Sequence, residues 1–325
     1  MNTSKILRVA TVQFQHKAND KAYNLAKIHQ FIDNAISEKV NVLVFPEMCI
    51  TGYWHVPKLP EHAIYALSER VSNRGDSGSL ALIKQKAIAH QMAIGVGLIE
   101  RAADDTLYNT WVVCMPDGSL HKHRKLHAFE HPIIKSGEQY TVFETPWGVK
   151  MGVLICWDNN LVENARANAL LGADILLAPH QTGGTNSRSP QSMKPIPMTL
   201  WENRHQDPQS LQEAFQGEHG KGWLMRWLPA RAHDNGMFVL FSNGVGRDEE
   251  EIRTGNAMII DPYGRVVKES KAINDDMVIA DLDLSLLENS TGRRWLTGRR
   301  PELYSILTTK LGNEQNPILV RFGKE

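Results

Sequence analysis

The segment MGVLICWDNN (151–160) changes abruptly from apolar to polar residues at a cysteine. The longer run GVKMGVLIC (148–156) predicts a buried strand. The next apolar run, ADILLAP (173–179), predicts a second buried strand, and residues 161–171 between the two runs predict a helix. Strand, helix and strand in this order are typical of helices packed on a mostly β centre. This segment therefore indicates an α/β fold.

The same alternation continues in both directions along the chain. The chain opens with a strand at ILRVATVQF (6–14), a helix up to Glu38 and a strand at VNVLVFPE (40–47). Further strands are predicted at 92–100, 110–115, 118–125, 237–243, 254–262, 264–270 and 277–284. Further helices are predicted near 79–91 and 221–233.

The composition and net charge of the chain indicate which kinds of molecule it binds. The 325 residues are 42% hydrophobic, which is enough for one large core. Lys plus Arg and Asp plus Glu are equal at 36 each, so no global field attracts nucleic acid, an anionic membrane or an acidic substrate. The balance favours a small-molecule partner.

The N-terminal segment and the cysteines indicate the cellular compartment in which the protein is expected. The opening MNTSKILRVATVQF lacks the pattern of a secretory signal, and no stretch approaches the roughly 20 apolar residues of a membrane helix. We therefore expect a cytoplasmic protein. The three cysteines, Cys49, Cys114 and Cys156, are widely spaced, so neither a disulfide framework nor a CxxC pair is predicted.

Two segments depart from the pattern. Between residues 180 and 220, glycines and prolines punctuate polar sequence, with one short helix expected near 211–215. A loop this long is typically functional, mobile or disordered, and we expect a lid or an interface. The tail, 285–325, places four arginines around Trp295, which is typical of an anion site or of a solvated, partner-facing or subunit-facing tail.

Three reactive side chains follow predicted strands, where α/β folds place their sites. Glu47, Lys125 and Cys156 each stand at such a position. A carboxylate can take the proton of a thiol, while a lysine lowers the pKa of that thiol and stabilises the oxyanion of an attacked carbonyl. The three residues together predict a cysteine nucleophile with its base and its cation.

Each residue also has a structural interpretation when it is taken alone. A cysteine after an apolar run is more often inert core, and the two charged residues could be an ordinary helix N-terminal carboxylate and a solvated loop cation. Cys49 is the rival nucleophile, but it lies too close to Glu47 in sequence for a substrate to fit between them. Cys114 is expected to be core.

Four histidines within eleven residues raise a metal hypothesis. They are His121, His123, His127 and His131. Their spacing comes with no cysteine partner and no helix to align them, so we favour a polar loop beside an active site and predict no metal.

The combination of these motifs resembles the nitrilase superfamily, the carbon–nitrogen hydrolases with a Glu-Lys-Cys triad. The matching stretches run in the expected order over most of residues 5–284. They are LVFPEMCITGY (43–53), LYNTWVV (107–113), KHRKLH (122–127), GVLICWD (152–158) with Glu163 seven residues after Cys156, ARANALLGADILLAP (165–179), WLPARAHDNGMFVLFSNGVG (227–246) and GNAMIIDPYGRVV (255–267).

The resemblance implies a four-layer α-β-β-α sandwich, with residues 1–284 as one domain and the tail as a subunit-packing segment of a homo-oligomer. It implies that Cys156 attacks a carbonyl carbon, that Lys125 and the backbone N–H of Trp157 hold the oxyanion, and that Glu47 passes the proton to the leaving nitrogen. A second family glutamate maps to Glu130, with Glu138 as the weaker candidate, and would position Lys125. No cofactor is implied.

The residues after the cysteine refine the expected substrate. Related carbamoylases of D-amino acids use arginines there to bind a carboxylate, whereas this chain has Asn159 and Asn160, which favours a neutral amide. True nitrilases typically carry a glutamate in place of Asp158. We therefore expect an amide or N-carbamoyl hydrolase, with a nitrilase as the alternative. An acyltransferase, a glutaminase module and a non-catalytic member are weaker alternatives.

The expected substrate contacts come from both sides of the nucleophile. They are Tyr53, Trp54, Trp157, Asp158 and Asn159. Trp201, in the 180–220 segment, and Trp54 are candidates for the walls of an apolar pocket, which suggests an aryl or alkyl group next to the amide. The alternative for these loop tryptophans is a subunit interface.

Overall fold

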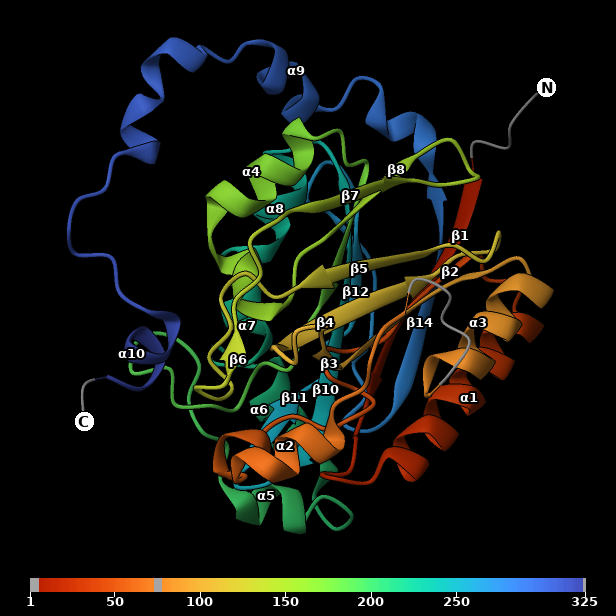
Figure 1. Cartoon of the computed structure of the whole chain (residues 1–325), viewed down its shortest axis with the longest axis vertical. Coiled ribbons are helices and arrows are strands. Elements are labelled where there is room, and N and C mark those ends of the chain that lie inside the picture. Colours follow the sequence, from red (N-terminus) through yellow and green to blue (C-terminus); the bar gives the residue numbers. More distant parts are fainter. Residues whose placement is uncertain (1–5, 73–77, 324–325) are drawn as a thin grey trace.

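The computed structural model describes residues 6–72 and 78–323. Within this part of the chain, 14 strands form one sheet that folds back on itself, so that its two halves face each other. Helices cover the outer face of each half: α1 and α3 lie on one side of the molecule and α4 and α8 on the other (Figure 1). The mixed α/β architecture predicted from the sequence, with four layers, is confirmed.

The first half of the sheet follows the order β5-β4-β3-β2-β1, with β14 antiparallel to β1 and β6 beside β4. Its strands are β1 (Ile6–Phe14), β2 (Val42–Val44), β3 (Ala93–Arg101), β4 (Leu107–Cys114), β5 (Leu120–Arg124), β6 (Ile134–Lys135) and β14 (Asp276–Asp283). Its covering helices are α1 (Lys21–Ser37) and α3 (Leu80–Ala89).

The second half follows the order β10-β9-β8-β7 and meets the first half where the ends of β1 and β10 pair in parallel. Its strands are β7 (Thr141–Glu144), β8 (Lys150–Val153), β9 (Ile175–Pro179), β10 (Phe238–Asp248), β11 (Glu251–Thr254), β12 (Met258–Ile260) and β13 (Val266–Glu269). Its covering helices are α4 (Val162–Leu170) and α8 (Leu228–His233).

The alternation of side chains along each strand explains the layers. Val9 of β1 points into the core between the two halves, whereas Ala10 points into the core under α1 and α3. In β9, Leu177 belongs to the central core and Leu176 to the core under α4 and α8. Because both faces of these strands are covered, the strands read as continuous apolar runs in the sequence.

The remaining helices are short. They are α2 (Glu61–Leu67), α5 (Met198–Glu202), α6 (Pro208–Gln216), α7 (Lys221–Leu224), α9 (Thr291–Thr297), α10 (Pro317–Phe322) and the 3₁₀-helices η1 (Val56–Lys58), η2 (Cys156–Asn160), η3 (Leu284–Leu287), η4 (Pro301–Leu303) and η5 (Ser305–Thr308). No helix in the described ranges combines the length and the apolar character that crossing a bilayer requires.

The 180–220 segment is more ordered than its sequence predicts. The helix expected near 211–215 exists as α6, and a second helix, α5, precedes it. Trp201 of α5 packs with Leu211 and Phe215 of α6 against Val245 and Ile252 of the sheet. A helix of five residues is too short to show helical periodicity in the sequence, so only its tertiary contacts reveal it.

Candidate active site

The three candidate catalytic residues stand on turns that follow strands. Lys125 comes directly after β5, and its backbone N–H donates to the carbonyl of Asn109 on β4 at 2.8 Å. Glu47 follows β2 in a turn that lies against β3, where a Cβ added to Gly97 would come within 2.3 Å of the Met48 nitrogen. Only a glycine on β3 lets this turn approach so closely.

Cys156 begins the 3₁₀-helix η2, three residues after β8 ends at Val153. Its φ of +49° lies in the left-handed region, which non-glycine residues seldom adopt and which is often found at functional sites. The residue is 8% exposed, and it lines a cavity of about 400 Å³. The turn therefore presents the thiol to this cavity.

Lys125 is fully buried between two carboxylates. Its Nζ donates to Glu47 Oε1 at 2.7 Å and to Glu130 Oε1 at 2.5 Å. Asn109 Nδ2 donates to the same two oxygens, at 2.7 and 3.0 Å. The structure thus places Glu47, Lys125 and Glu130, which the sequence analysis singled out, in one buried network.

The second oxygen of Glu47 is the exception within this network. Glu47 Oε2 is buried, and no described residue forms a hydrogen bond with it. Burial raises the pKa of Glu47 to about 7, against the opposing effect of Lys125. A carboxylate with one unpartnered oxygen and a pKa near neutrality has the properties of a general base.

The charges around Lys125 determine its protonation. Burial lowers the pKa of Lys125, but the facing carboxylates of Glu130 and Glu47 outweigh it, so the pKa lies well above its ordinary value. Burial and the negative charge of Glu47 raise the pKa of the Cys156 thiol, against Lys125 and the backbone N–H of Gln181. The thiol is therefore protonated at rest and needs a base during attack.

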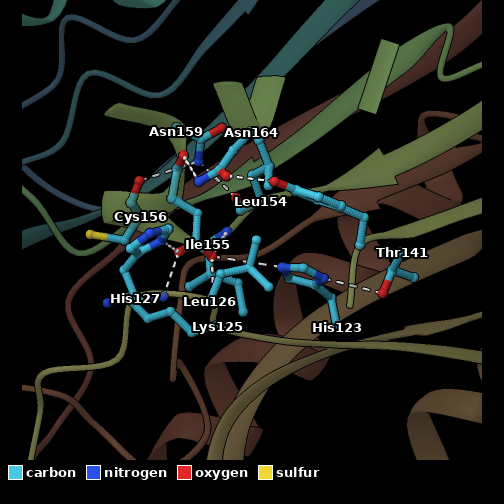
Figure 2. Close-up of polar contacts among 12 residues, drawn as sticks. His123, Lys125, Leu126, His127, Thr141, Leu154, Ile155, Cys156, Asn159 and Asn164 are labelled. Atoms are coloured by element: carbon cyan, nitrogen blue, oxygen red, sulfur yellow. Dashed lines mark hydrogen bonds and ion pairs between the residues drawn. The ribbon is translucent and has the colours of Figure 1, made fainter. Parts of the chain in front are cut away.

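Asp158 connects the loop of the lysine to the loop of the cysteine. Its carboxylate accepts from the backbone N–H groups of Leu126 (3.1 Å), His127 (2.9 Å) and Ile155 (3.2 Å). His127 Nδ1 also lies 2.9 Å from this carboxylate, and Figure 2 shows Leu126, His127 and Ile155 gathered in this network. Asp158 is fully buried and does not line the cavity, so these contacts support a positioning role, and its contact with substrate stays a prediction.

Asn159 is likewise turned away from the cavity. Its side-chain amide donates to the carbonyls of Leu154 (2.7 Å) and Cys156 (3.3 Å) and lies 3.1 Å from His180 Nε2. Figure 2 shows the sulfur of Cys156 pointing away from Asn159. The residue is fully buried and does not line the cavity, because alternate residues of a 3₁₀-turn face different sides; its contact with substrate stays a prediction.

Six of the residues that line the cavity are aromatic. Tyr53, Trp54 and Trp157, which were predicted to contact substrate, line it. Phe129, Trp223 and Trp227 line it as well, and none of these three was predicted. Trp201, expected as a wall, does not, because α5 buries it in a separate apolar cluster.

Two polar residues of the site had no clear signal in the sequence. Asn109 lies within the family-like stretch LYNTWVV, but nothing in the residues themselves marks it as the link between Glu47 and Glu130. Gln181 lines the cavity, and its side-chain amide donates to the backbone carbonyl of Glu47 at 2.9 Å. Both contacts join segments far apart in the chain, so only the folded structure reveals them.

The other two cysteines lie in the core under α1 and α3. Cys49 Sγ contacts the backbone of Gly97, and burial raises the pKa of Cys49 to about 12. Burial likewise raises the pKa of Cys114 to about 12. Neither residue lines the cavity that contains Cys156.

The four clustered histidines do not converge on one point, although His123 and His127 both lie near Asp158. His121 stacks on Phe143, His123 Nδ1 lies 3.1 Å from Thr141 Oγ1, His127 binds Asp158, and His131 Nδ1 accepts from the backbone of Ile133. Across residues 6–72 and 78–323, no group of three His, Cys, Asp or Glu side chains is placed to hold a metal ion.

The chain is similar to several known proteins over most of its length. The chain is 27% identical to a probable nitrilase of Schizosaccharomyces pombe, over 92% of this chain and 97% of the relative. It is also 27% identical to a 2-oxoglutaramate amidase of Bacillus subtilis, over 85% and 90% of the two chains.

Among solved structures, the fold is similar to the crystal structure of Saccharomyces cerevisiae Nit3, a member of branch 10 of the nitrilase superfamily. The TM-score is 0.68 at 22% identity, covering 93% of this chain and 98% of Nit3. The family model for carbon–nitrogen hydrolases matches residues 8–290, which include all the candidate catalytic residues. The chain therefore belongs to the carbon–nitrogen hydrolase family.

Proposed function

We propose that the protein hydrolyses the amide or N-carbamoyl carbon–nitrogen bond of a small molecule through a thioester on Cys156. The observation that carries this proposal is that Cys156 lines a cavity with aromatic walls, while the charge of Lys125, which acts on the thiol, is held buried between two glutamates. A thiol, a carboxylate with a free oxygen and a fixed cation are the groups that acyl transfer requires.

The first half of the reaction forms the thioester. Glu47 takes the thiol proton on its unpartnered oxygen, and the Cys156 sulfur forms a bond to the carbonyl carbon. The carbonyl electron pair moves to the oxygen, which Lys125 and the backbone N–H of Trp157 stabilise. When the electron pair returns, the carbon–nitrogen bond breaks, and Glu47 delivers its proton to the departing ammonia or amine.

The second half regenerates the thiol. Glu47, again ionised, takes a proton from water, and the hydroxide oxygen forms a bond to the thioester carbon. The carbon–sulfur bond then breaks, the acid leaves, and the proton on Glu47 returns to the Cys156 sulfur. Glu130 and Asn109 act as positioning residues, because they bind Lys125 and Glu47.

The walls of the cavity indicate the acyl group. Six aromatic side chains line the cavity, and they favour an alkyl or aryl group next to the scissile amide: Tyr53, Trp54, Phe129, Trp157, Trp223 and Trp227. Residues of the 180–220 segment from Gln181 to Met193 also line it, which supports a role for this segment in substrate choice.

The relatives bear on the choice between amide and nitrile. The Bacillus subtilis relative is named an amidase, which supports an amide substrate. The Schizosaccharomyces pombe relative is named a probable nitrilase, so a nitrile is the second candidate. We further propose that the enzyme works in the cytoplasm as a homo-oligomer.

Ammonia release from primary amides, carbamoyl compounds and nitriles tests the proposal, with wild type and Cys156→Ala compared side by side. Cys114→Ala is the matched control, because its thiol is buried away from the cavity. We expect amides to react with the wild type and with Cys114→Ala, and Cys156→Ala to be inactive. Turnover of nitriles alone would favour the nitrilase, and activity retained by Cys156→Ala would overturn the proposed nucleophile.

A further inference from the structure

We propose that the C-terminal helix α10 forms the outer wall of the active-site cavity and that Val320 and Arg321 determine which acyl groups fit. The inference rests on the proposed amide hydrolysis for its chemistry. Both residues line the same cavity as Cys156, although α10 is the last helix of the described chain.

Arg321 fixes α10 at the mouth of the cavity. Its guanidinium donates to the carbonyl of Asn186 and to Thr185 Oγ1, both at 2.7 Å, and lies 3.9 Å from a Glu251 carboxylate oxygen. Two of these partners belong to the 180–220 segment, so Arg321 joins the two parts of the chain that the sequence left least defined. A planar guanidinium with several partners holds a fixed orientation.

Aromatic contacts also hold this helix. The ring of Phe322 lies 6.3 Å from Trp54 and 6.2 Å from Phe129, measured between centroids. The Arg321 guanidinium lies 5.3 Å from the Trp54 ring and 5.9 Å from the Phe129 ring. Because Trp54 and Phe129 are themselves cavity walls, α10 completes an enclosure that they begin.

The segment that leads to α10 is largely exposed. Figure 1 shows the connection between α9 and α10 as an arc outside the layers of the fold, and Leu307 and Leu311 on it are 65% and 72% exposed. The α10 helix is therefore placed by its own contacts at the cavity. Changes to its cavity-facing side chains leave the four layers intact, so such variants are expected to fold.

This placement predicts a limit on acyl length. A small acyl group bound at Cys156 occupies the inner part of the cavity, while a longer one extends toward Val320. Enlarging residue 320 fills the space that the longer group needs, and reducing it opens that space. The effect appears as a difference between substrates and not as a uniform loss.

The test measures kcat/KM for acetamide and 4-phenylbutyramide in four variants. We expect Val320→Trp to lower the ratio of phenylbutyramide to acetamide activity about tenfold, and Val320→Ala to raise it. Arg321→Ala is expected to change the ratio because it releases α10. Leu311→Ala, on the exposed connection, is the matched control and keeps the wild-type ratio. An unchanged ratio in Val320→Trp would overturn the inference.

A binding measurement separates this inference from the proposed function. The tryptophans of the cavity report ligand binding by fluorescence, so phenylbutyramide can be titrated into Cys156→Ala with and without Val320→Trp. If no amide is hydrolysed but Val320→Trp still weakens phenylbutyramide binding, the proposed reaction is overturned, whereas the role of α10 as the outer wall of the cavity is supported. If amides are hydrolysed and phenylbutyramide binds equally to both proteins, the proposed role of α10 is overturned.

Discussion

Glu47 is a buried carboxylate with only one of its two oxygens in hydrogen bonds. One oxygen binds Lys125 and Asn109, which fixes the side chain, and the other is left without a hydrogen-bond partner. Burial alone would favour the neutral acid, whereas Lys125 favours the anion, and the balance brings the pKa to about 7. Both protonation states of Glu47 are therefore accessible near neutral pH, as a proton shuttle requires.

This balance predicts how activity depends on pH. The ionised form of Glu47 is the one that accepts the thiol proton, so kcat/KM is expected to fall as pH decreases through about 7. The pH profile of kcat/KM with a neutral amide checks this, because the substrate itself does not titrate. An acid limb near 4.5, the ordinary value for a glutamate, would contradict the assignment.

Asp158 shows a different use of a buried carboxylate. It ties the backbone on the C-terminal side of Lys125 to the backbone just before Cys156, so it sets the separation of the cation and the nucleophile. Burial raises the pKa of Asp158, but the neighbouring imidazoles of His127, at 2.9 Å, and His123, at 3.6 Å, outweigh burial, so the pKa lies below its ordinary value. Asp158 is ionised at every pH at which the enzyme is expected to work.

Replacing this carboxylate tests the positioning role. Asp158→Asn puts an amide donor against backbone N–H groups, and we expect a loss of about 1–3 kcal/mol in unfolding free energy. We also expect kcat to fall more than KM rises, because Lys125 and Cys156 lose their alignment. Urea unfolding and steady-state kinetics measure the two effects. Asp33→Asn, on the exposed face of α1, is the control; equal behaviour of the two variants would argue against the role.

At the scale of elements, the active site depends on close packing between the Glu47 turn and β3. The turn lies against the backbone of β3, where Gly97 accepts a hydrogen bond from the Ile50 N–H at 3.0 Å. The backbone of β3 supports the turn, and the turn carries the Glu47 carboxylate. A side chain at position 97 would separate them.

Gly97→Ala is therefore expected to be costly although it adds a single methyl group. The added carbon would lie 2.3 Å from the Met48 nitrogen, so the turn must shift, at about 1–3 kcal/mol in unfolding free energy. Activity should fall with it, because Glu47 moves away from Lys125. Thermal unfolding and kcat check both. Gly298→Ala, whose nearest neighbour would be 3.6 Å away, should change neither; a tolerant Gly97→Ala would show that the turn is not fixed by β3.

At the scale of the whole molecule, the outer surface carries apolar side chains that this chain does not cover. Leu170 and Leu171 at the end of α4, Trp295 of α9 and Leu307 on the connection to α10 are each about half exposed or more. Exposed apolar groups of this size often mark a protein interface. They support the proposed homo-oligomer, with the tail as a packing segment.

The oligomer is testable by light scattering coupled to size-exclusion chromatography. We expect the wild type to elute as a dimer or larger, and Leu307→Glu to shift the population toward the monomer, because a buried unpaired charge weakens an interface. Val267→Glu, a similarly exposed apolar residue on β13, is the control and keeps the wild-type mass. A monomeric wild type would show that the exposed leucines serve another purpose.

The sequence by itself determined the alternation of strands and helices along most of the chain, because strands covered on both faces read as continuous apolar runs and helices show their own period. The four-layer arrangement came from the family resemblance, and the short strands β6 and β7 had no signal in the sequence. Glu47, Lys125, Cys156 and Glu130 could be singled out because they follow such strands or match family stretches. The burial of Asp158 and Asn159 and the packing of Trp201 away from the cavity had no signal in the sequence.

Only the tertiary structure decided which of these side chains face the cavity. Asp158 and Asn159 turn beneath η2 because buried backbone groups need partners, and Trp201 is taken up by the packing of α5 on α6. In their place the fold brings Gln181 and Arg321 to the cavity from distant segments. The local sequence pattern indicates the secondary structure in which a residue lies. Contacts between segments far apart in the chain depend on tertiary packing, which the local pattern does not encode.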